Sequence, residues 1–132
     1  MPASRFLAAA ILGATPLAAH PEIEAGLARL NTAIAAQPGD AELYLQRGEL
    51  YAKHADWMHA EANYLRAAEL DPKLPRLAQA RGALELSVGR PAGARPLLDA
   101  AIALDSRDAT ALVLRARAHR ALGSTAAALA DF

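Results

Sequence analysis

The sequence predicts an all-α protein in which helix-turn-helix units stack side by side as an α-solenoid. The first observation is that the small and apolar positions of residues 41–74 return at a fixed spacing of about 34 residues. The second is composition, because alanine and leucine dominate and aromatic residues make up only 5% of the chain, which suits closely packed helices. The third is the position of helix-ending and helix-capping residues, because proline, glycine and aspartate recur where one helix would end and the next begin.

The internal repeat appears when the chain is shifted against itself by one repeat length. One small position recurs in the first helix of each unit, and a small and a large position recur in the second helix. These three series are Gly48, Gly82, Ala116; Ala60, Ala94, Ala128; and Tyr64, Leu98, Phe132. Small residues on one helix therefore receive large residues from the other, which is how protein interiors reach dense packing.

From Pro21 onward the chain resembles the tetratricopeptide-repeat (TPR) family. Within residues 41–74 the family pattern is matched at Tyr44, Gly48, Tyr51, Ala60, Tyr64, Ala67 and Pro72. The sequence departs from the pattern where leucine is expected, at Arg47, Arg81 and Arg115. The resemblance implies stacked tetratricopeptide helix pairs whose first helices form a concave surface. It says little about function, because members of this family bind many unrelated partners.

Residues 1–19 differ from the repeats and have the layout of a secretory signal peptide. A single positive residue precedes the apolar run 6–12, and small residues follow. Gly13 and Pro16 break the run, which is too short for a comfortable membrane span. We therefore expect a periplasmic or secreted bacterial protein whose mature chain begins near His20. The alternative is an ordinary first repeat helix and a cytoplasmic location.

Residues 21–40 are predicted to form half a repeat, and residues 41–74 a complete one. Residues 21–40 match the second helix of a repeat, with proline at a favourable first position. In the first full repeat, 41–74, helices are expected over about 41–54 and 57–70. Asp71 should end the second of these, because a residue that precedes proline disfavours the α conformation.

The second repeat, 75–108, is more degenerate, and the third, 109–132, is incomplete. In the second repeat Pro91 suits a helix start, but Pro96 would then remove a hydrogen bond from the second turn. We expect this helix either to start late, near Gly93, or to bend. The third repeat stops within its second helix, so we interpret the chain as C-terminally truncated. Its uncovered apolar end should fray or self-associate.

The sequence argues against an enzyme, a metal site and a nucleic-acid partner. Lys plus Arg equal Asp plus Glu at 14 each, so no global field favours nucleic acid. Cysteine is absent, and His54 and His59 do not share one helical face. The glycine-rich segment 89–93 lacks the ending of a phosphate loop. We expect no cofactor, and we interpret Trp57 as a packing residue, with a binding anchor as the alternative.

The expected binding surface is the concave face implied by the resemblance. Because Tyr44, Gly48 and Tyr51 face the paired helix, the residues between them must face elsewhere. The predicted partner-binding residues are Glu42, Leu45, Glu49, Lys53, Gln79, Ala83, Leu86, Val113, Arg117 and Arg120, with Ala52, Arg76, Ser87 and Thr110 on the same face. This groove should be acidic at its N-terminal end, apolar in the middle and basic at its C-terminal end.

The leading functional hypothesis is a non-catalytic scaffold that binds a peptide or protein segment in this groove. The peptide should have one acidic end and an apolar centre. Within the family, a subset grips C-terminal carboxylates with Lys and Asn, but Leu45 and Glu49 stand at those positions here, so such recognition is disfavoured. The alternatives are a structural self-assembly module, or a regulatory repeat segment of a larger protein that continues beyond Phe132.

Overall fold

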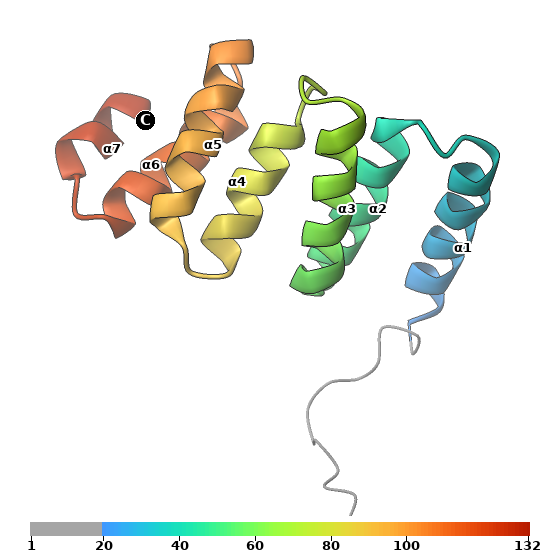
Figure 1. Ribbon diagram of the computed structural model, residues 1–132. Coiled ribbons are helices and arrows are strands. Elements are labelled where there is room, and N and C mark those ends of the chain that lie inside the picture. The colour runs from blue at the N-terminus through green and yellow to red at the C-terminus, as the bar shows by residue number, and fades with distance from the viewer. Residues whose placement is uncertain (1–19) are drawn as a thin grey trace, which may run out of the picture.

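The computed structural model describes residues 20–132, in which seven helices follow one another along a single row (Figure 1). The predicted signal peptide, residues 1–19, lies outside the described residues. The helices are α1 (Pro21–Ala36), α2 (Ala41–Lys53), α3 (Trp57–Leu70), α4 (Leu77–Ser87), α5 (Pro91–Leu104), α6 (Ala109–Ala121) and α7 (Thr125–Asp131). The described residues contain no strand, so the predicted all-α repeat fold is confirmed.

The helices pack as pairs that stack in two layers. Helix α2 packs against α3, α4 against α5, and α6 against α7, which are the first and second helices of the three repeats. The first helices α2, α4 and α6 also contact one another in sequence, whereas no such contact joins α3 to α5. The first helices therefore form one continuous layer of the solenoid, and the groove lies on it.

Close approach of the paired helices depends on glycine. A Cβ atom added to Gly48 would lie 2.5 Å from Cε1 of Tyr64, and one added to Gly82 would lie 2.7 Å from Cδ2 of Leu98. Each glycine of a first helix thus receives the large residue of the second. The main core cluster that results contains Leu45, Ala60, Tyr64, Ala67, Leu77 and Leu84.

The starts of the first helices follow their capping residues. Asp40 accepts a hydrogen bond from the backbone N–H of Glu42 at 3.0 Å, and Asp108 accepts one from Ala111 at 2.9 Å. These caps satisfy donors that the first turn leaves unpaired. The equivalent position of the second repeat is Leu74, which cannot accept, and α4 begins only at Leu77.

Of the two alternatives expected for helix α5, the late start near Gly93 is excluded. The helix begins at Pro91, and Pro96 lies inside it. The start is possible because the N–H that Pro91 lacks belongs to the first turn, where no intrahelical acceptor exists. The backbone N–H groups of Gly93 and Ala94 both donate to the carbonyl of Arg90, at 3.1 Å each. Pro96 has no N–H to donate, so one intrahelical hydrogen bond is absent, and the helix nevertheless continues to Leu104.

The turn between the two helices of each repeat has a residue in the left-handed conformation. Its φ angle is +60° at Ala55, +78° at Gly89 and +80° at Gly123, which are equivalent positions of the three repeats. Only glycine adopts this conformation without a steric cost. Ala55 is therefore the strained member of the series.

Candidate peptide-binding groove

A groove of about 530 Å³ lies on the layer of first helices. Its lining residues come mostly from α2 and α4, with additions from α3 and α6: Glu49, Ala52, Lys53, Trp57, Tyr64, Arg76, Gln79, Ala80, Ala83, Ser87, Thr110 and Leu114. A second hollow shares Thr110 and Leu114 and continues along α6. A third shares Glu49 and Lys53 and continues toward α1. The three hollows form one surface that crosses the successive repeats.

Most of the predicted residues lie on this surface. Glu49, Lys53, Gln79 and Ala83 line the central groove. Val113 and Arg117 line the hollow beside α6, and Glu42 is hydrogen-bonded to the groove residue Arg76. The structure therefore brings residues from three repeats together, as the stacking of the first helices requires.

Three predicted residues lie elsewhere. Leu45 has no exposed surface and belongs to the core cluster, so its prediction as a partner-binding residue is wrong. Its cluster joins residues of α3 to two leucines of α4, and the contribution of α4 cannot be read from the α2–α3 pair alone. Leu86 is half-buried against the cluster of Ala94 and Leu98. Arg120 is exposed but does not line the three hollows.

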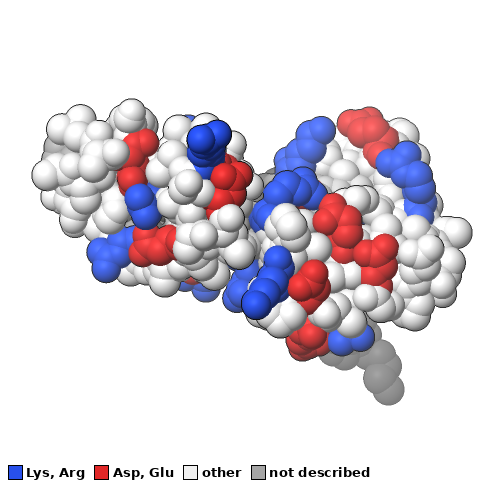
Figure 2. Space-filling model, turned by 90° about the horizontal axis from the view of Figure 1, so that it is seen from above, with Lys and Arg blue, Asp and Glu red and all other residues white. Residues whose placement is uncertain are grey.

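The charges of the groove also differ from expectation. Arg76, from the start of α4, donates to Glu42 at 2.8 Å and to Glu49 at 3.3 Å. Burial raises the pKa of Glu49, and the positive charge of Arg76 partly opposes this effect. The N-terminal end of the groove was expected to be acidic, but the two carboxylates share a guanidinium. Figure 2 shows basic and acidic side chains interspersed over one face of the molecule rather than separated.

Two aromatic residues of α3 contribute to the groove, and sequence reasoning assigned neither to it. Tyr64 is only 3% exposed but lines the groove. Burial, together with the charge of Glu49, raises the pKa of Tyr64 to about 12. Trp57 packs against the core cluster and lines the groove as well, so it combines packing with availability to a partner. The position of Tyr64 opposite Gly48 predicted that it packs against α2, and the ring fills the space at that glycine.

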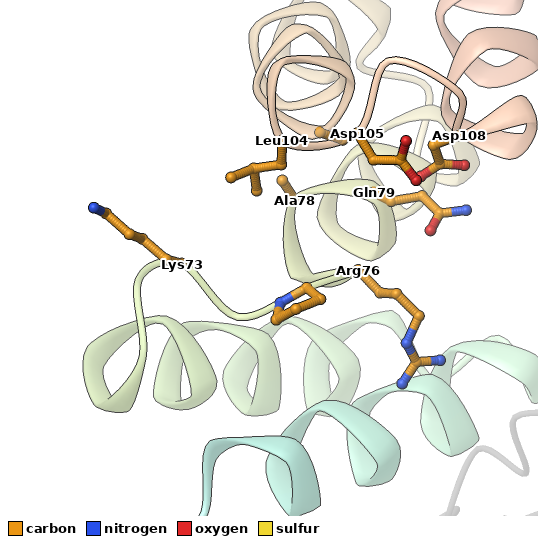
Figure 3. Close-up of a pocket in the computed structure, with 9 residues that line it drawn as sticks. Lys73, Arg76, Ala78, Gln79, Leu104, Asp105 and Asp108 are labelled. Carbon is orange, nitrogen blue, oxygen red and sulfur yellow. The ribbon is translucent and has the colours of Figure 1, made fainter.

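A smaller cavity of about 260 Å³ lies beside the groove, where the α3–α4 turn approaches the α5–α6 turn. Figure 3 shows Asp105 and Asp108 near Gln79, while Arg76 points away from them. Both carboxylates have structural tasks, because Asp105 accepts the N–H of Arg107 and Asp108 that of Ala111, at 2.9 Å each. The acidic pair is therefore part of the turn and the cap.

The histidines flagged in the sequence also have local roles. His59 lies 2.8 Å from a carboxylate oxygen of Asp56 and stacks on the ring of Tyr51 at 4.9 Å. Among residues 20–132, no group of three or more His, Cys, Asp or Glu side chains gathers as a metal site. Within the same part of the chain, none of the helices has the length and apolar character needed to cross a bilayer.

The stacked helix pairs, the periodic pattern of small and large residues and the groove on the first helices define this chain as a TPR-like α-solenoid. Solved structures of similar fold include MamA 41-end from Desulfovibrio magneticus RS-1, with a TM-score of 0.77 and 22% identity over 84% of this chain and 63% of that one. Another is YrrB, described as a TPR protein with an unusual peptide-binding site, with a TM-score of 0.68 and 21% identity over 87% of this chain and 63% of that one.

The comparisons establish the fold and no more. A MamA RS-1 double mutant gives a TM-score of 0.75 at 23% identity, over 83% of this chain and 61% of that one. The chain thus spans a little under two thirds of the length of these structures. No protein-family model matches the sequence, and no curated protein matches it.

Proposed function

We propose that this chain is a non-catalytic scaffold that binds a peptide segment of a partner protein in the groove over α2, α4 and α6. The observation that carries the proposal is the continuity of three hollows along the first helices. The peptide-binding site in the description of YrrB, a protein of similar fold, supports the same kind of partner.

The lining of the groove favours a particular peptide chemistry. Small and apolar side chains occupy its middle, among them Ala80, Ala83 and Leu114. The carboxylates of Glu42 and Glu49 are offset by Arg76, whereas Lys53 and Arg117 form no ion pair with any described residue. The preferred ligand is therefore a peptide with an apolar centre and an acidic end over α6. Charges at the rim would set its direction and association rate.

Two arginines of α6 provide a matched test. Arg117 lines the hollow and Arg120 does not, although both are exposed. We expect Arg117→Glu to weaken partner capture at least tenfold and Arg120→Glu to change it by less than threefold, with equal helical content by circular dichroism. A further control reverses the exposed pair Arg66 and Glu69 of α3, joined at 2.9 Å. If that reversal abolishes capture and Arg117→Glu does not, the groove is not the binding site.

We also propose that the protein is exported and that its signal peptide is cleaved. This proposal rests on the charged, apolar and small-residue order of residues 1–19. Mass spectrometry of protein made in a bacterial host should find a mature chain that begins near His20. An intact Met1 recovered from the cytoplasmic fraction would contradict export.

A second candidate function is self-assembly through the C-terminal end. Leu122, Leu129 and Phe132 are 39%, 69% and 67% exposed there, whereas Ala128 of α7 is buried. Sedimentation that shows a strict monomer would exclude this candidate. The third alternative, a regulatory segment of a larger protein, would be tested by the coding sequence beyond residue 132.

A further inference from the structure

An arginine ties neighbouring second helices together in two of the three repeats. In the first repeat, Arg47 of α2 donates from Nε to Asn63 at 2.7 Å and from Nη1 to Asn31 at 2.8 Å. Asn63 lies on α3 of the same repeat, and Asn31 lies on α1 before it. One guanidinium thus spans the gap between two second helices.

The third repeat uses the same device with charged acceptors. Arg115 of α6 donates from Nε and Nη2 to the two oxygens of Asp131, at 2.7 and 2.6 Å, and from Nη1 to Asp99 at 3.0 Å. Asp131 lies on α7 and Asp99 on α5. A bidentate arginine–carboxylate pair is among the strongest polar contacts that proteins make.

The middle repeat has the arginine without the acceptors. Arg81 stands one repeat length after Arg47 and one repeat length before Arg115. At the positions equivalent to the acceptors of its neighbours stand Leu65 on α3 and Leu97 on α5, neither of which can accept a hydrogen bond. Arg81 is half-buried and forms no hydrogen bond or ion pair with any residue of the described chain.

The nitrogens of Arg81 are not among the buried side-chain atoms that lack a partner, so the guanidinium keeps contact with water and can meet an acceptor from another molecule. Leu65 remains 46% exposed, so the position is open to another molecule. By the equivalence with Arg47 and Arg115, Arg81 should extend toward the positions of Leu65 and Leu97, which do not line the groove.

We propose that Arg81, Leu65 and Leu97 form a second binding site, which takes a carboxylate side chain of a partner protein flanked by apolar residues. The partner supplies the acceptor that Asp99 and Asp131 supply to Arg115 within the chain. A carboxylate matches the fork of the guanidinium, and its apolar neighbours cover the two leucines. The site shares no residue with the lining of the groove, so it stands whether or not the groove binds a peptide.

The first experiment tests whether the guanidinium of Arg81 lies between positions 65 and 97, by placing hydrogen-bond acceptors at both positions. Leu65→Asp with Leu97→Asp gives the middle repeat the arrangement of the third repeat. We expect the Nε–H resonance of Arg81 to shift and its exchange with water to slow at least tenfold in this variant. An unchanged Arg81 resonance would show that the guanidinium does not lie between these positions and would overturn the proposal.

Binding is then measured with an end-blocked probe peptide, Gln-Leu-Ala-Asp-Leu-Ala-Gln, and with matched forms that have Lys for Asp or Ser for both leucines. The acidic apolar peptide should shift the Arg81 Nε–H resonance. Arg81→Leu, which places the leucine of the family pattern at this position and should fold normally, should weaken binding at least tenfold. The variant with two added aspartates should weaken it similarly, because its site is already filled.

The remaining experiments test whether the ligand is a protein segment, a simple anion or a second copy of the chain, and whether the groove contributes to binding. Arg117→Glu should leave binding of this probe within twofold. If Arg81→Leu changes binding by less than twofold, the proposal is wrong. If inorganic phosphate shifts Arg81 as strongly as the peptide and the leucines of the probe make no difference, the site takes simple anions and the assignment to a protein partner is wrong. A dimer that Arg81→Leu dissociates would assign the site to a second copy and likewise overturn it.

Discussion

The first and second repeats have the same steric pattern but differ in their polar residues. Both place a glycine of the first helix against a large residue of the second, Gly48 against Tyr64 and Gly82 against Leu98. In the first repeat, however, an aspartate caps α2 and Arg47 has two acceptors, whereas α4 lacks a side-chain cap and Arg81 has leucines at the acceptor positions.

The comparison indicates that steric packing specifies the helix pairs, whereas polar contacts affect where a helix starts and how neighbouring repeats are joined. The second repeat has leucine at the cap position and α4 begins at Leu77, yet the helix pair α4–α5 is intact. The residue before that start, Arg76, has a φ of +68° and reaches back to Glu42 and Glu49. The degenerate repeat thus acquires a clamp to its neighbour in place of a local cap.

The largest expected effect is on the free energy of unfolding when each of the three repeat arginines is replaced by leucine. Arg115→Leu should lower the free energy of unfolding by about 2 kcal/mol, because it leaves the carboxylate of Asp131 buried without its partner. Arg47→Leu should cost about 1.5 kcal/mol, since the side chain of Asn63 loses a donor. Arg81→Leu should change stability by less than about 0.5 kcal/mol. Urea unfolding of the three variants measures the differences, and equal losses would contradict the assigned roles.

The next effect concerns the two glycines. Gly48→Ala should destabilise by about 1.5 kcal/mol, because the added methyl group meets the rigid ring of Tyr64. Gly82→Ala meets Cδ2 and Cγ of the buried Leu98, both at 2.7 Å, which is a slightly longer contact with a branched side chain instead of a ring, so a loss of about 1 kcal/mol is expected. Thermal unfolding followed by circular dichroism would rank them. A larger loss at Gly82 would show that ring rigidity does not decide the cost.

A smaller effect depends on pH. Hydrogen bonds from Arg115 hold the pKa of Asp131 below its usual value, so ionised Asp131 stabilises the folded chain. This contribution is present above the ordinary carboxyl pKa of about 3.9 and is lost as pH falls through the lowered folded value. Asp131→Asn should therefore be less stable by about 1 kcal/mol at neutral pH. The difference from the wild type should shrink below about pH 4, and a difference that persists there would contradict this origin.

The smallest expected effect is a gain. Ala55 has the left-handed conformation that Gly89 and Gly123 have in the other two repeats. Ala55→Gly should relieve its strain and raise stability by about 0.5 kcal/mol after the greater backbone entropy of glycine in the unfolded chain is subtracted. The matched change Gly89→Ala should lower stability by a similar amount. Differential scanning calorimetry of both variants checks the sign, and opposite signs from these would reject the strain argument.

The sequence alone determined the helix pairs and their order. The repeat period, the glycine and alanine series and the proline punctuation are local or strictly periodic signals. For this reason α1, α2 and α3 lie where the sequence predicted them, with differences of a residue at the ends. Glu49, Lys53, Gln79 and Ala83 were placed in the groove by the same periodicity.

The packing between successive repeats sets which residues of the first helices are buried and which charged side chains form ion pairs. Leu45 is buried in a cluster that includes residues of α3 and α4, and Arg76 donates to Glu42, a residue one repeat earlier in the chain. Neither event follows from one helix pair, because each depends on the angle and distance between successive pairs. The sequence repeat supplies Arg81 and the two leucines at the acceptor positions, but the distance between them depends on how α4 packs against α3 and α5.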